Sequence, residues 1–223
     1  MRTFLLGFAL VLVLRTFVMQ VYGITTPSMD TTLRVGDYVV ASGVGYGAYV
    51  PFTETRLPGF RSPRNGDVVV YRPVGYDPPV DVIKRVLGEP GDTLRMVERV
   101  LYRNGRRLEE RYIEPTYADD EPLPAVGPHN FTWQLEALPA GATREDYRPS
   151  RDNWGPLVVP AGRYLLLGDN RDRSTDSRHL GFVSRAEIRG RVLAIYYSSD
   201  PAPAHSFPRL FTAARWHRIG RVR

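Results

Sequence analysis

Residues 80–87 read Val80-Asp-Val-Ile-Lys-Arg-Val-Leu87, and the turn-forming run Gly88-Glu-Pro-Gly91 follows them. Half of this segment is β-branched, which predicts a short strand. Side chains of a strand point alternately to its two faces, so Lys84 shares a face with Val82 and Val86. If that face is buried, desolvation lowers the pKa of Lys84 toward neutrality, as a general base requires. The alternative is an exposed lysine on an edge strand, where it would discourage aggregation.

Lys84 is also the only lysine in the chain. Lysine and arginine together number 30, so every other residue of this pair is arginine. A codon bias accounts for the skew but does not explain why one position escaped it. Arginine keeps its proton at any accessible pH, whereas a buried lysine can lose it. Two interpretations stay open: the single lysine marks a position where arginine would not serve, or it survived there by chance.

Other segments of the chain follow the same strand pattern. They are short, β-branched or aromatic, and bounded by Gly, Pro or Asp. Asn104-Gly105, inside residues 100–107, is a strong signal for a two-residue hairpin turn. Long amphipathic helical periodicity is missing outside the amino terminus, so the sequence predicts a mostly β protein. Further strands are expected at residues 37–41, 67–72, 163–167 and 189–197.

One stretch interrupts this pattern. Residues 112–160 hold many Pro, Gly and acidic residues, which predicts an irregular insertion or lid. A chain of 223 residues can bury one good core, so one domain with a large insertion is expected. We expect a β core that carries the candidate site over residues 25–92 and 157–223. A smaller, partly irregular β region is expected over residues 93–156.

The amino terminus predicts a membrane anchor over residues 1–24. The apolar run 4–14 is too short to cross a bilayer, which takes about 17–25 residues. Counted from Thr3 to Tyr22, with Arg15 extending toward the headgroups, the length suffices. Arg2 and the free amine would stay in the cytoplasm and the remainder would cross. A cleaved signal peptide is the alternative, but no small-x-small cleavage site follows the apolar core.

The composition narrows the classes of function. The formal charge of +6 and the pI of about 9.7 fit an anionic membrane surface or nucleic acid. The arginines are scattered and no aromatic-basic repeat occurs, so nucleic acid is not an expected partner. The chain has no cysteine and four isolated histidines, so neither a metal nor another cofactor is expected. The arginine-rich tail 209–223 fits either contact with a membrane surface or a solvated tail docked by one tryptophan.

Two further segments carry candidate chemistry. Residues 24–37 read Ile24-Thr-Thr-Pro-Ser-Met-Asp-Thr-Thr-Leu-Arg-Val-Gly-Asp37, directly after the expected anchor. Residues 168–183 read Gly168-Asp-Asn-Arg-Asp-Arg-Ser-Thr-Asp-Ser-Arg-His-Leu-Gly-Phe-Val183, directly after an expected strand. Each segment alone could be an ordinary surface loop. The dense polar run of the second also suits a hydrogen-bonded turn that supports a site.

Taken together and in this order, the three segments resemble type I signal peptidases. The resemblance rests on Ser-Met with a following Thr-Leu, then Lys-Arg-Val-x-Gly-x-Pro-Gly-Asp at 84–92, then Gly-Asp-Asn-Arg-Asp-x-Ser-x-Asp-Ser-Arg at 168–178. It covers most of the chain. It implies an anchored, signal-peptidase-like antiparallel β catalytic core and a serine endopeptidase that removes signal peptides from secretory precursors. It also implies a single-pass protein of the inner membrane, with the lipid bilayer as a partner and the catalytic part on the extracytoplasmic side.

The resemblance also implies a role for each matching residue. Ser28 matches the nucleophile, and Lys84 matches the base that takes its proton. Thr26 falls where relatives place an oxyanion-binding hydroxyl, and Ser174 matches the hydroxyl that orients the lysine amine. Shallow pockets for small substrate side chains are implied at Ile24, Met29, Leu33, Val82 and Ile83, and supporting ion pairs for Arg85 with Asp169 and for Arg178 with Asp176.

Three other functions stay open from the sequence. His179 with Asp176 could belong to a Ser-His-Asp triad, although no Gly-x-Ser-x-Gly elbow surrounds any serine. A membrane-tethered β module that binds peptides without cutting them is the non-enzymatic alternative. A relative specialised for one substrate is the third.

Overall fold

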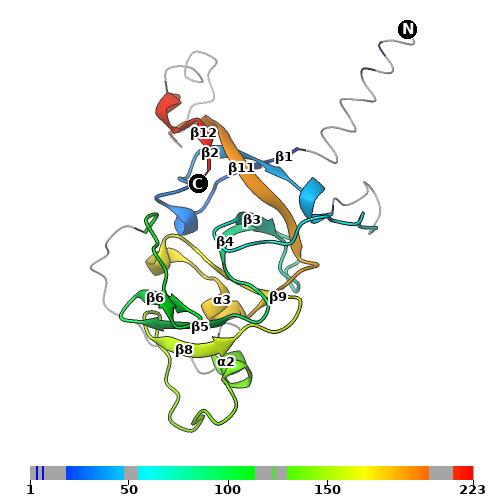
Figure 1. Cartoon of the computed structure of the whole chain (residues 1–223). Coiled ribbons are helices and arrows are strands. Elements are labelled where there is room, and N and C mark those ends of the chain that lie inside the picture. The colour runs from blue at the N-terminus through cyan, green and yellow to red at the C-terminus, as the bar shows by residue number, and fades with distance from the viewer. Residues whose placement is uncertain are drawn as a thin grey trace.

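Two antiparallel sheets form the protein (Figure 1). The computed structural model describes residues 4, 7, 19–47, 55–113, 123, 130–200 and 213–222. The larger sheet is 8-stranded in the order β1-β2-β11-β3-β4-β9-β10, with β12 paired to β11. The smaller sheet is 4-stranded in the order β7-β6-β5-β8.

The larger sheet consists of β1 (Gln20–Gly23), β2 (Asp37–Ser42), β3 (Val68–Tyr71), β4 (Val82–Gly88), β9 (Arg163–Leu167), β10 (Val183–Ser184), β11 (Ile188–Ser198) and β12 (Gly220–Arg221). The smaller sheet consists of β5 (Thr93–Val97), β6 (Val100–Arg103), β7 (Arg106–Arg107) and β8 (Trp154–Val158). The described helices are short: α2 (Thr132–Ala137), α3 (Ser177–Leu180), and the 3₁₀ turns η2 (Pro27–Met29), η3 (Val44–Tyr46), η4 (Arg171–Arg173) and η5 (Trp216–Arg218).

The mostly β, antiparallel fold expected from the sequence is confirmed. Strand β9 has the expected bounds, while β4 begins at Val82, two residues later than expected. The hairpin at Asn104-Gly105 is also confirmed, because both residues have positive φ, of 51° and 77°, between β6 and β7. That backbone matches the two-residue turn that Asn-Gly favours.

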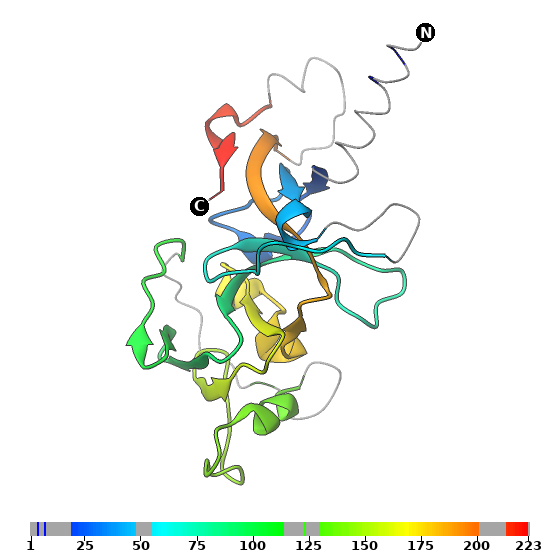
Figure 2. The same cartoon turned by 45° about the vertical axis from the view of Figure 1, so that its right-hand side comes forward.

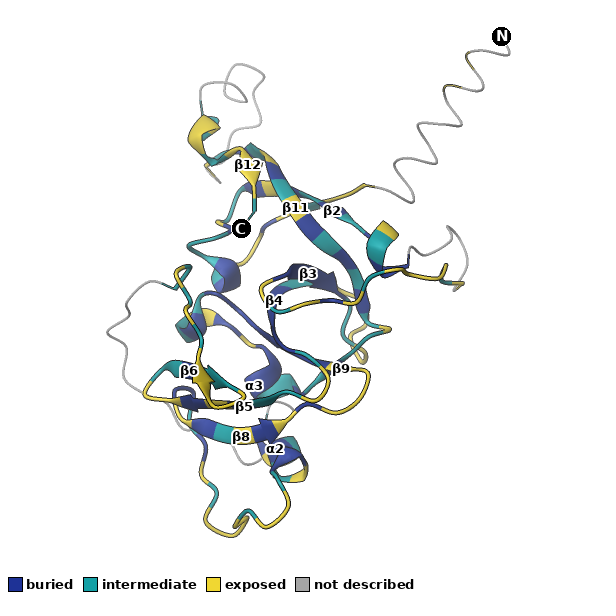
Figure 3. Ribbon diagram, viewed as in Figure 1, coloured by how far each residue is buried: buried dark blue, intermediate teal, exposed yellow. Residues whose placement is uncertain are grey.

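The larger sheet is most deeply buried at its centre. Every residue of β3 is buried, and β4 is buried from Lys84 onward (Figure 3). Strand β4 lies between β3 and β9, so it is not an edge strand. The alternative of a solvent-facing edge lysine is therefore wrong.

The smaller sheet is an excursion from the larger one. The chain leaves at the end of β4 and returns at β9, and these two strands pair, with Gly88 opposite Leu165. In Figure 2 the excursion lies below the larger sheet. The excursion packs around a buried apolar cluster that it shares with β9, with Leu94, Leu101 and Trp154 on one side and Leu165 and Leu167 on the other.

The stretch 112–160 is more regular than expected, because α2 and β8 both fall in it. Gly155 and Pro156 interrupt the strand pattern that would have revealed β8. Gly155 has a φ of +86°, and a Cβ there would lie 2.6 Å from the Leu94 carbonyl oxygen. Only glycine fits this close approach, so the residue that hides the strand in the sequence is the one that lets it pair.

The expected anchor overlaps the sheet at its end. Gln20–Gly23 form β1, in which Val21 pairs with Val40 of β2, so placing residues up to 24 in the anchor is wrong. A short apolar run with Val and Tyr suits either a helix or a strand. Among the residues described here, no helix is long and apolar enough to span a bilayer. Apart from residues 4, 7 and 19–24, the anchor range lies outside the described residues.

The described end of the tail returns to the larger sheet through arginine. Arg218 and Arg215 donate to the fully buried Asp37 carboxylate at the start of β2, with Arg218 Nη2 at 2.6 Å. Trp216 stays 57% exposed, so of the two alternatives for the tail, docking by one tryptophan is wrong. The tail is attached by buried charge pairs.

Candidate active site

The side chains of Ser28 and Lys84 meet although 56 positions separate them. Ser28 lies in η2, a 3₁₀ turn with Pro27 in its first positions, where the fixed φ of proline suits a helical start. The Lys84 Nζ lies 2.8 Å from the Ser28 Oγ and 3.2 Å from the Ile83 carbonyl oxygen. Both side chains are buried, with Lys84 only 2% exposed. The sequence-based pairing of these two residues agrees with this geometry.

The surroundings of Lys84 favour its neutral form. In the sheet register Lys84 is opposite Val69, which belongs to the same buried apolar cluster as Val86. Burial lowers the pKa of Lys84 below its ordinary value, although the Asp176 and Asp169 carboxylates oppose the shift. A neutral amine beside a hydroxyl can accept the hydroxyl proton.

Thr26 adds a second hydroxyl next to Ser28. Its Oγ1 lies 3.4 Å from the Ser28 Oγ, at the long end of hydrogen-bond range. Pro27 between them has no N–H, so the donors near Ser28 Oγ come from side chains and from other peptide groups. The structure thus places the Thr26 hydroxyl next to that of Ser28, and the role of Thr26 as an oxyanion donor stays a prediction.

No hydrogen bond joins Ser174 to the Lys84 amine, although the resemblance implies that this hydroxyl orients the amine. Its hydroxyl is buried and makes no hydrogen bond of normal geometry with any described residue. It lies close enough to Asp176 to help lower the pKa of that carboxyl. In this structure the Ile83 carbonyl, rather than Ser174, is the second partner of the Lys84 amine.

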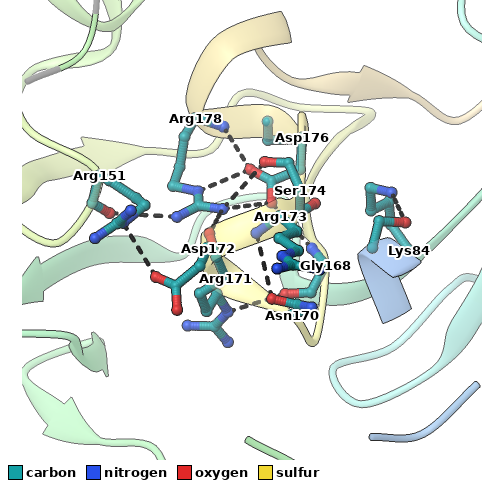
Figure 4. Close-up of polar contacts among 12 residues, drawn as sticks. Lys84, Arg151, Gly168, Asn170, Arg171, Asp172, Arg173, Ser174, Asp176 and Arg178 are labelled. Atoms are coloured by element: carbon teal, nitrogen blue, oxygen red, sulfur yellow. Dashed lines mark hydrogen bonds and ion pairs between the residues drawn. The ribbon is translucent and has the colours of Figure 1, made fainter. Parts of the chain in front are cut away.

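The loop after β9 is hydrogen-bonded to the backbone of Ser28. Figure 4 shows the polar contacts within this loop. The Asn170 N–H donates to the Ser28 carbonyl oxygen at 3.1 Å. Within the loop, Arg178 Nη2 and the Gly168 N–H donate to Asp176 Oδ2 at 2.8 and 3.0 Å. Burial alone would raise the pKa of Asp176, but its pairing with Arg178 and these hydrogen bonds hold it below the ordinary range. The expected Arg178–Asp176 pair is therefore present in the structure.

The expected pair of Arg85 and Asp169 is also present, and it joins β4 to the same loop. Arg85 donates from Nε and Nη2 to the two oxygens of Asp169 at 2.9 and 2.7 Å, a bidentate geometry. Thr32 Oγ1 donates to Asp169 at 2.5 Å. Thr32 lies shortly after Ser28, so this network fixes the nucleophile segment against β4 and the loop.

A cleft of about 480 Å³ opens over Ser28 and Lys84. Four of the five residues expected to bind substrate line it, namely Ile24, Met29, Val82 and Ile83. Leu33 does not, because its side chain is fully buried in the core beside Met29. Sequence reasoning also missed Arg173, Thr175 and Tyr76, which line the cleft but carry no pattern that marks them.

The polar contacts favour lysine over histidine as the partner of the serine. The Asp176 carboxylate faces Arg178 and the Gly168 N–H, while the Ser28 hydroxyl faces the Lys84 amine. In the part of the chain that the structure describes, no three His, Asp or Glu side chains cluster as a metal site would need. A serine hydroxyl held against a deprotonatable, buried amine is the arrangement of a serine hydrolase that uses lysine as its base.

Comparison with known proteins gives the family. The model described as "Signal peptidase, peptidase S26" matches residues 1–197, and the chain belongs to this family of serine peptidases. The chain is 34% identical to signal peptidase I of Pseudomonas aeruginosa, over 86% of this chain and 70% of that protein. It is 33% identical to signal peptidase I of Rickettsia typhi, over 84% and 75%. The chain therefore functions as a signal peptidase I, and its substrates are precursor proteins.

A solved signal peptidase I from Enterococcus faecalis is 28% identical to the chain. The match covers 59% of this chain and 97% of that one. Its TM-score is 0.36, so the two structures superpose too loosely to bear on the fold.

Proposed function

We propose that this chain removes N-terminal signal peptides with Ser28 as the nucleophile and Lys84 as the general base. The single observation that carries the proposal is the 2.8 Å separation between the Lys84 Nζ and the Ser28 Oγ inside a buried setting. The neutral amine takes the hydroxyl proton as Oγ attacks the carbonyl carbon of the scissile bond. The resulting ammonium then gives this proton to the nitrogen of the leaving peptide, and the mature protein departs.

The second half of the reaction uses the same two groups. The signal peptide remains as an ester on Ser28 Oγ, and Lys84, neutral again, takes a proton from an attacking water. The water oxygen adds to the ester carbonyl carbon and gives a tetrahedral intermediate. This intermediate collapses, the bond to Ser28 Oγ breaks, and the proton returns to that oxygen. These proton transfers need no base beyond Lys84, because its amine recovers the neutral form in each half of the reaction.

Thr26 is the proposed oxyanion donor. Its Oγ1 lies 3.4 Å from the Ser28 Oγ, so an oxygen on the attacked carbon would come within its reach. Removing one such donor typically costs about 3 kcal/mol of transition-state stabilisation. The site is supported by two ion pairs, Arg85 with Asp169 and Arg178 with Asp176, and by Ser174. Ser174 acts through the loop, since it makes no hydrogen bond with the Lys84 amine.

The cleft suits an extended peptide. Ile24, Met29, Val82 and Ile83 line it with apolar surface, which favours small apolar side chains at the first and third positions before the cut. A peptide strand beside the backbone of residues 24–26 and 82–83 would bind through main-chain hydrogen bonds. We further propose that residues before β1 anchor the chain in the inner membrane by a single crossing, with the cleft on the extracytoplasmic side where precursors emerge.

The test is cleavage of a secretory precursor by detergent-solubilised full chain. The wild type is compared with Ser28→Ala, Lys84→Ala, Lys84→Arg and His179→Ala. Cleavage at the signal-peptide boundary that is lost in the first three variants and retained in His179→Ala supports the dyad. Arginine keeps a cation but cannot supply a base, so Lys84→Arg separates the need for charge from the need for a proton acceptor.

Two results would overturn the assignment. Cleavage that survives Lys84→Ala but not His179→Ala would transfer the role of the base to the histidine. Binding of the precursor by the wild type with no serine-dependent cut would leave a peptide-binding module. A wild type that cuts one precursor of a diverse panel and no other would point to a specialised member of the family.

A further inference from the structure

Arg173 is an unpaired cation in the cleft. It ends η4, its side chain is exposed, and it lines the same cleft as Ser28 and Lys84. Within the described part of the chain, the guanidinium makes no hydrogen bond or ion pair. Its backbone, in contrast, is held, because the Arg173 N–H donates to Asn170 Oδ1 at 3.2 Å. Arg173 lies beside Asn170 and Ser174 in Figure 4. The backbone of Arg173 is therefore held in place, while its guanidinium is free to bind a group of the substrate.

The other ionisable side chains that line the cleft leave this charge uncompensated. Both oxygens of Asp81 accept hydrogen bonds from Arg72 at 2.8 Å, so the only carboxylate of the lining is already paired. Burial raises the pKa of Tyr22 to about 12, so its phenol is neutral at physiological pH. Lys84 is shifted toward its neutral form. The free positive charge of the cleft is thus that of Arg173.

The position of Arg173 along the cleft assigns the part of the substrate that meets it. Under the proposed function, residues before the cut lie against Ile24, Val82 and Ile83. Arg173 comes from a different wall, the loop whose Asn170 N–H donates to the Ser28 carbonyl. The other walls of the cleft come from residues 24–26, just before the reacting serine, and from residues 82–83 of β4. Since the residues before the cut occupy the walls of 24–26 and 82–83, the wall of Arg173 is left for the residues that follow the cut.

We propose that Arg173 determines specificity by selecting precursors with Asp or Glu among the first three residues after the cut. A carboxylate there would accept charge-assisted hydrogen bonds from the guanidinium, which has no competing partner. The contact is solvent-exposed, and exposed pairs of this kind change an equilibrium by about two- to fivefold. The inference rests on the proposed function, because it takes Ser28 as the point where the chain is cut.

The test uses matched precursor peptides that are identical up to the cut. Each of the first three positions after it carries Glu, Gln or Lys in turn, so that Glu and Gln compare a charge at nearly constant shape. The readout is the ratio of kcat/KM for Glu over Gln at each position, and a general loss of activity in a variant cancels from this ratio. For the wild type at low salt we expect a ratio of about two to five at one or more positions. Raising the salt should bring it toward one.

The variants then assign the preference to one side chain. Arg173→Gln should bring the Glu over Gln ratio to one, and Arg173→Glu should invert the preference so that Lys is favoured. Arg163→Gln is the matched control, because Arg163 is exposed on β9 and does not line the cleft. Its ratio should equal that of the wild type.

The outcomes separate this inference from the proposed function. A wild type that cuts Glu and Gln substrates equally, or an Arg173→Gln variant that keeps the preference, would overturn the role of Arg173 while leaving the dyad intact. Cleavage that persists in Ser28→Ala would instead overturn the proposed function itself.

Discussion

Lys84 combines a polar function with an apolar location. Strand β4 holds its amine close to Ser28 in a buried position. Burial there destabilises the charged form, so the amine prefers to be neutral. For catalysis this preference is useful, because only the neutral amine can take the serine proton. The rate of cleavage should therefore report the protonation of this one residue.

We predict that kcat/KM rises with pH and reaches half of its maximum below 10.5, the ordinary pKa of lysine. The sign follows from the lowered pKa: the neutral fraction grows as pH rises through it. The measurement is a pH profile of precursor cleavage, with His179→Ala as the control for histidine titration. A midpoint at or above 10.5, or one that moves with His179→Ala, would contradict the prediction.

Gly168 is a second residue whose identity the site requires. A Cβ at this position would press against Ser174 Oγ and come within 2.5 Å of the Ser28 carbonyl oxygen. The clash would push the nucleophile segment away from Lys84, and displacements of about 1 Å can cost on the order of 100-fold in rate. We predict a loss of about this size for Gly168→Ala, measured as kcat/KM. Gly45→Ala is the control, because its Cβ would meet nothing closer than 3.6 Å; equal losses in both variants would refute the packing argument.

At the scale of elements, the Arg85–Asp169 pair holds β4 against the loop after β9. Both side chains are nearly inaccessible, at 2% and 1% exposed. Removing one member of such a pair leaves an unpaired buried charge, which typically costs about 3–5 kcal/mol. We predict a loss of stability of that order for Arg85→Ala, measured by urea unfolding. The exposed pair of Arg111 and Glu109 is the comparison, and Arg111→Ala should change stability by less than about 0.5 kcal/mol.

The elements that the sequence predicts well are those whose pattern is local. Residues 163–167 form a strand with the expected bounds, and Asn104-Gly105 turns the expected hairpin. The errors lie where a local pattern suits two structures. Residues 20–23 suit the end of an apolar helix as well as a strand, and pairing with β2 decides between them. Gly155 looks like a strand breaker until the close approach of Leu94 is known.

At the scale of the whole molecule, the tail and the nucleophile segment are joined at Asp37. Arg218 also donates to the Thr32 carbonyl, and Arg215 to the Val35 carbonyl, so the tail holds the segment that follows Ser28. We predict that Arg218→Gln lowers stability by about 2 kcal/mol at pH 7, less than a lone buried pair would lose because Arg215 remains. The exposed Arg221→Gln is the control and should have little effect.

The pH dependence of this effect has a definite sign. Burial alone would raise the pKa of Asp37, but hydrogen bonds from Arg218 and Ser198 hold it below 3.8. The contribution of Asp37 is therefore complete above pH 3.8 and is lost as the pH falls through the lowered value. Thermal unfolding of wild type and Arg218→Gln should give a gap that narrows below pH 3.8, and a constant gap would contradict the ion-pair explanation.

The site itself was predictable to the extent that its residues stand in contiguous motifs. Ser28, Lys84 and the ion pairs of the loop lie in such motifs, and their contacts agree with the resemblance. Leu33 faces the core instead of the cleft, because its side chain packs in the buried cluster with Met29, and no local pattern of the sequence specifies that direction. The contact of Arg218 with Asp37 joins residues 181 positions apart, which no local pattern can reveal.

The excursion between β4 and β9 begins and ends at neighbouring points, because Gly88 pairs with Leu165. The excursion is therefore an insertion whose two ends are held next to each other by the pairing of β4 with β9. Its length is nearly free, since doubling a loop adds only about 0.6 kcal/mol to its closure. The insertion can therefore become longer or shorter in evolution, and a reporter can be fused to its hairpin turn at Asn104-Gly105. Neither change alters the distance between Ser28 and Lys84, which lie outside the insertion.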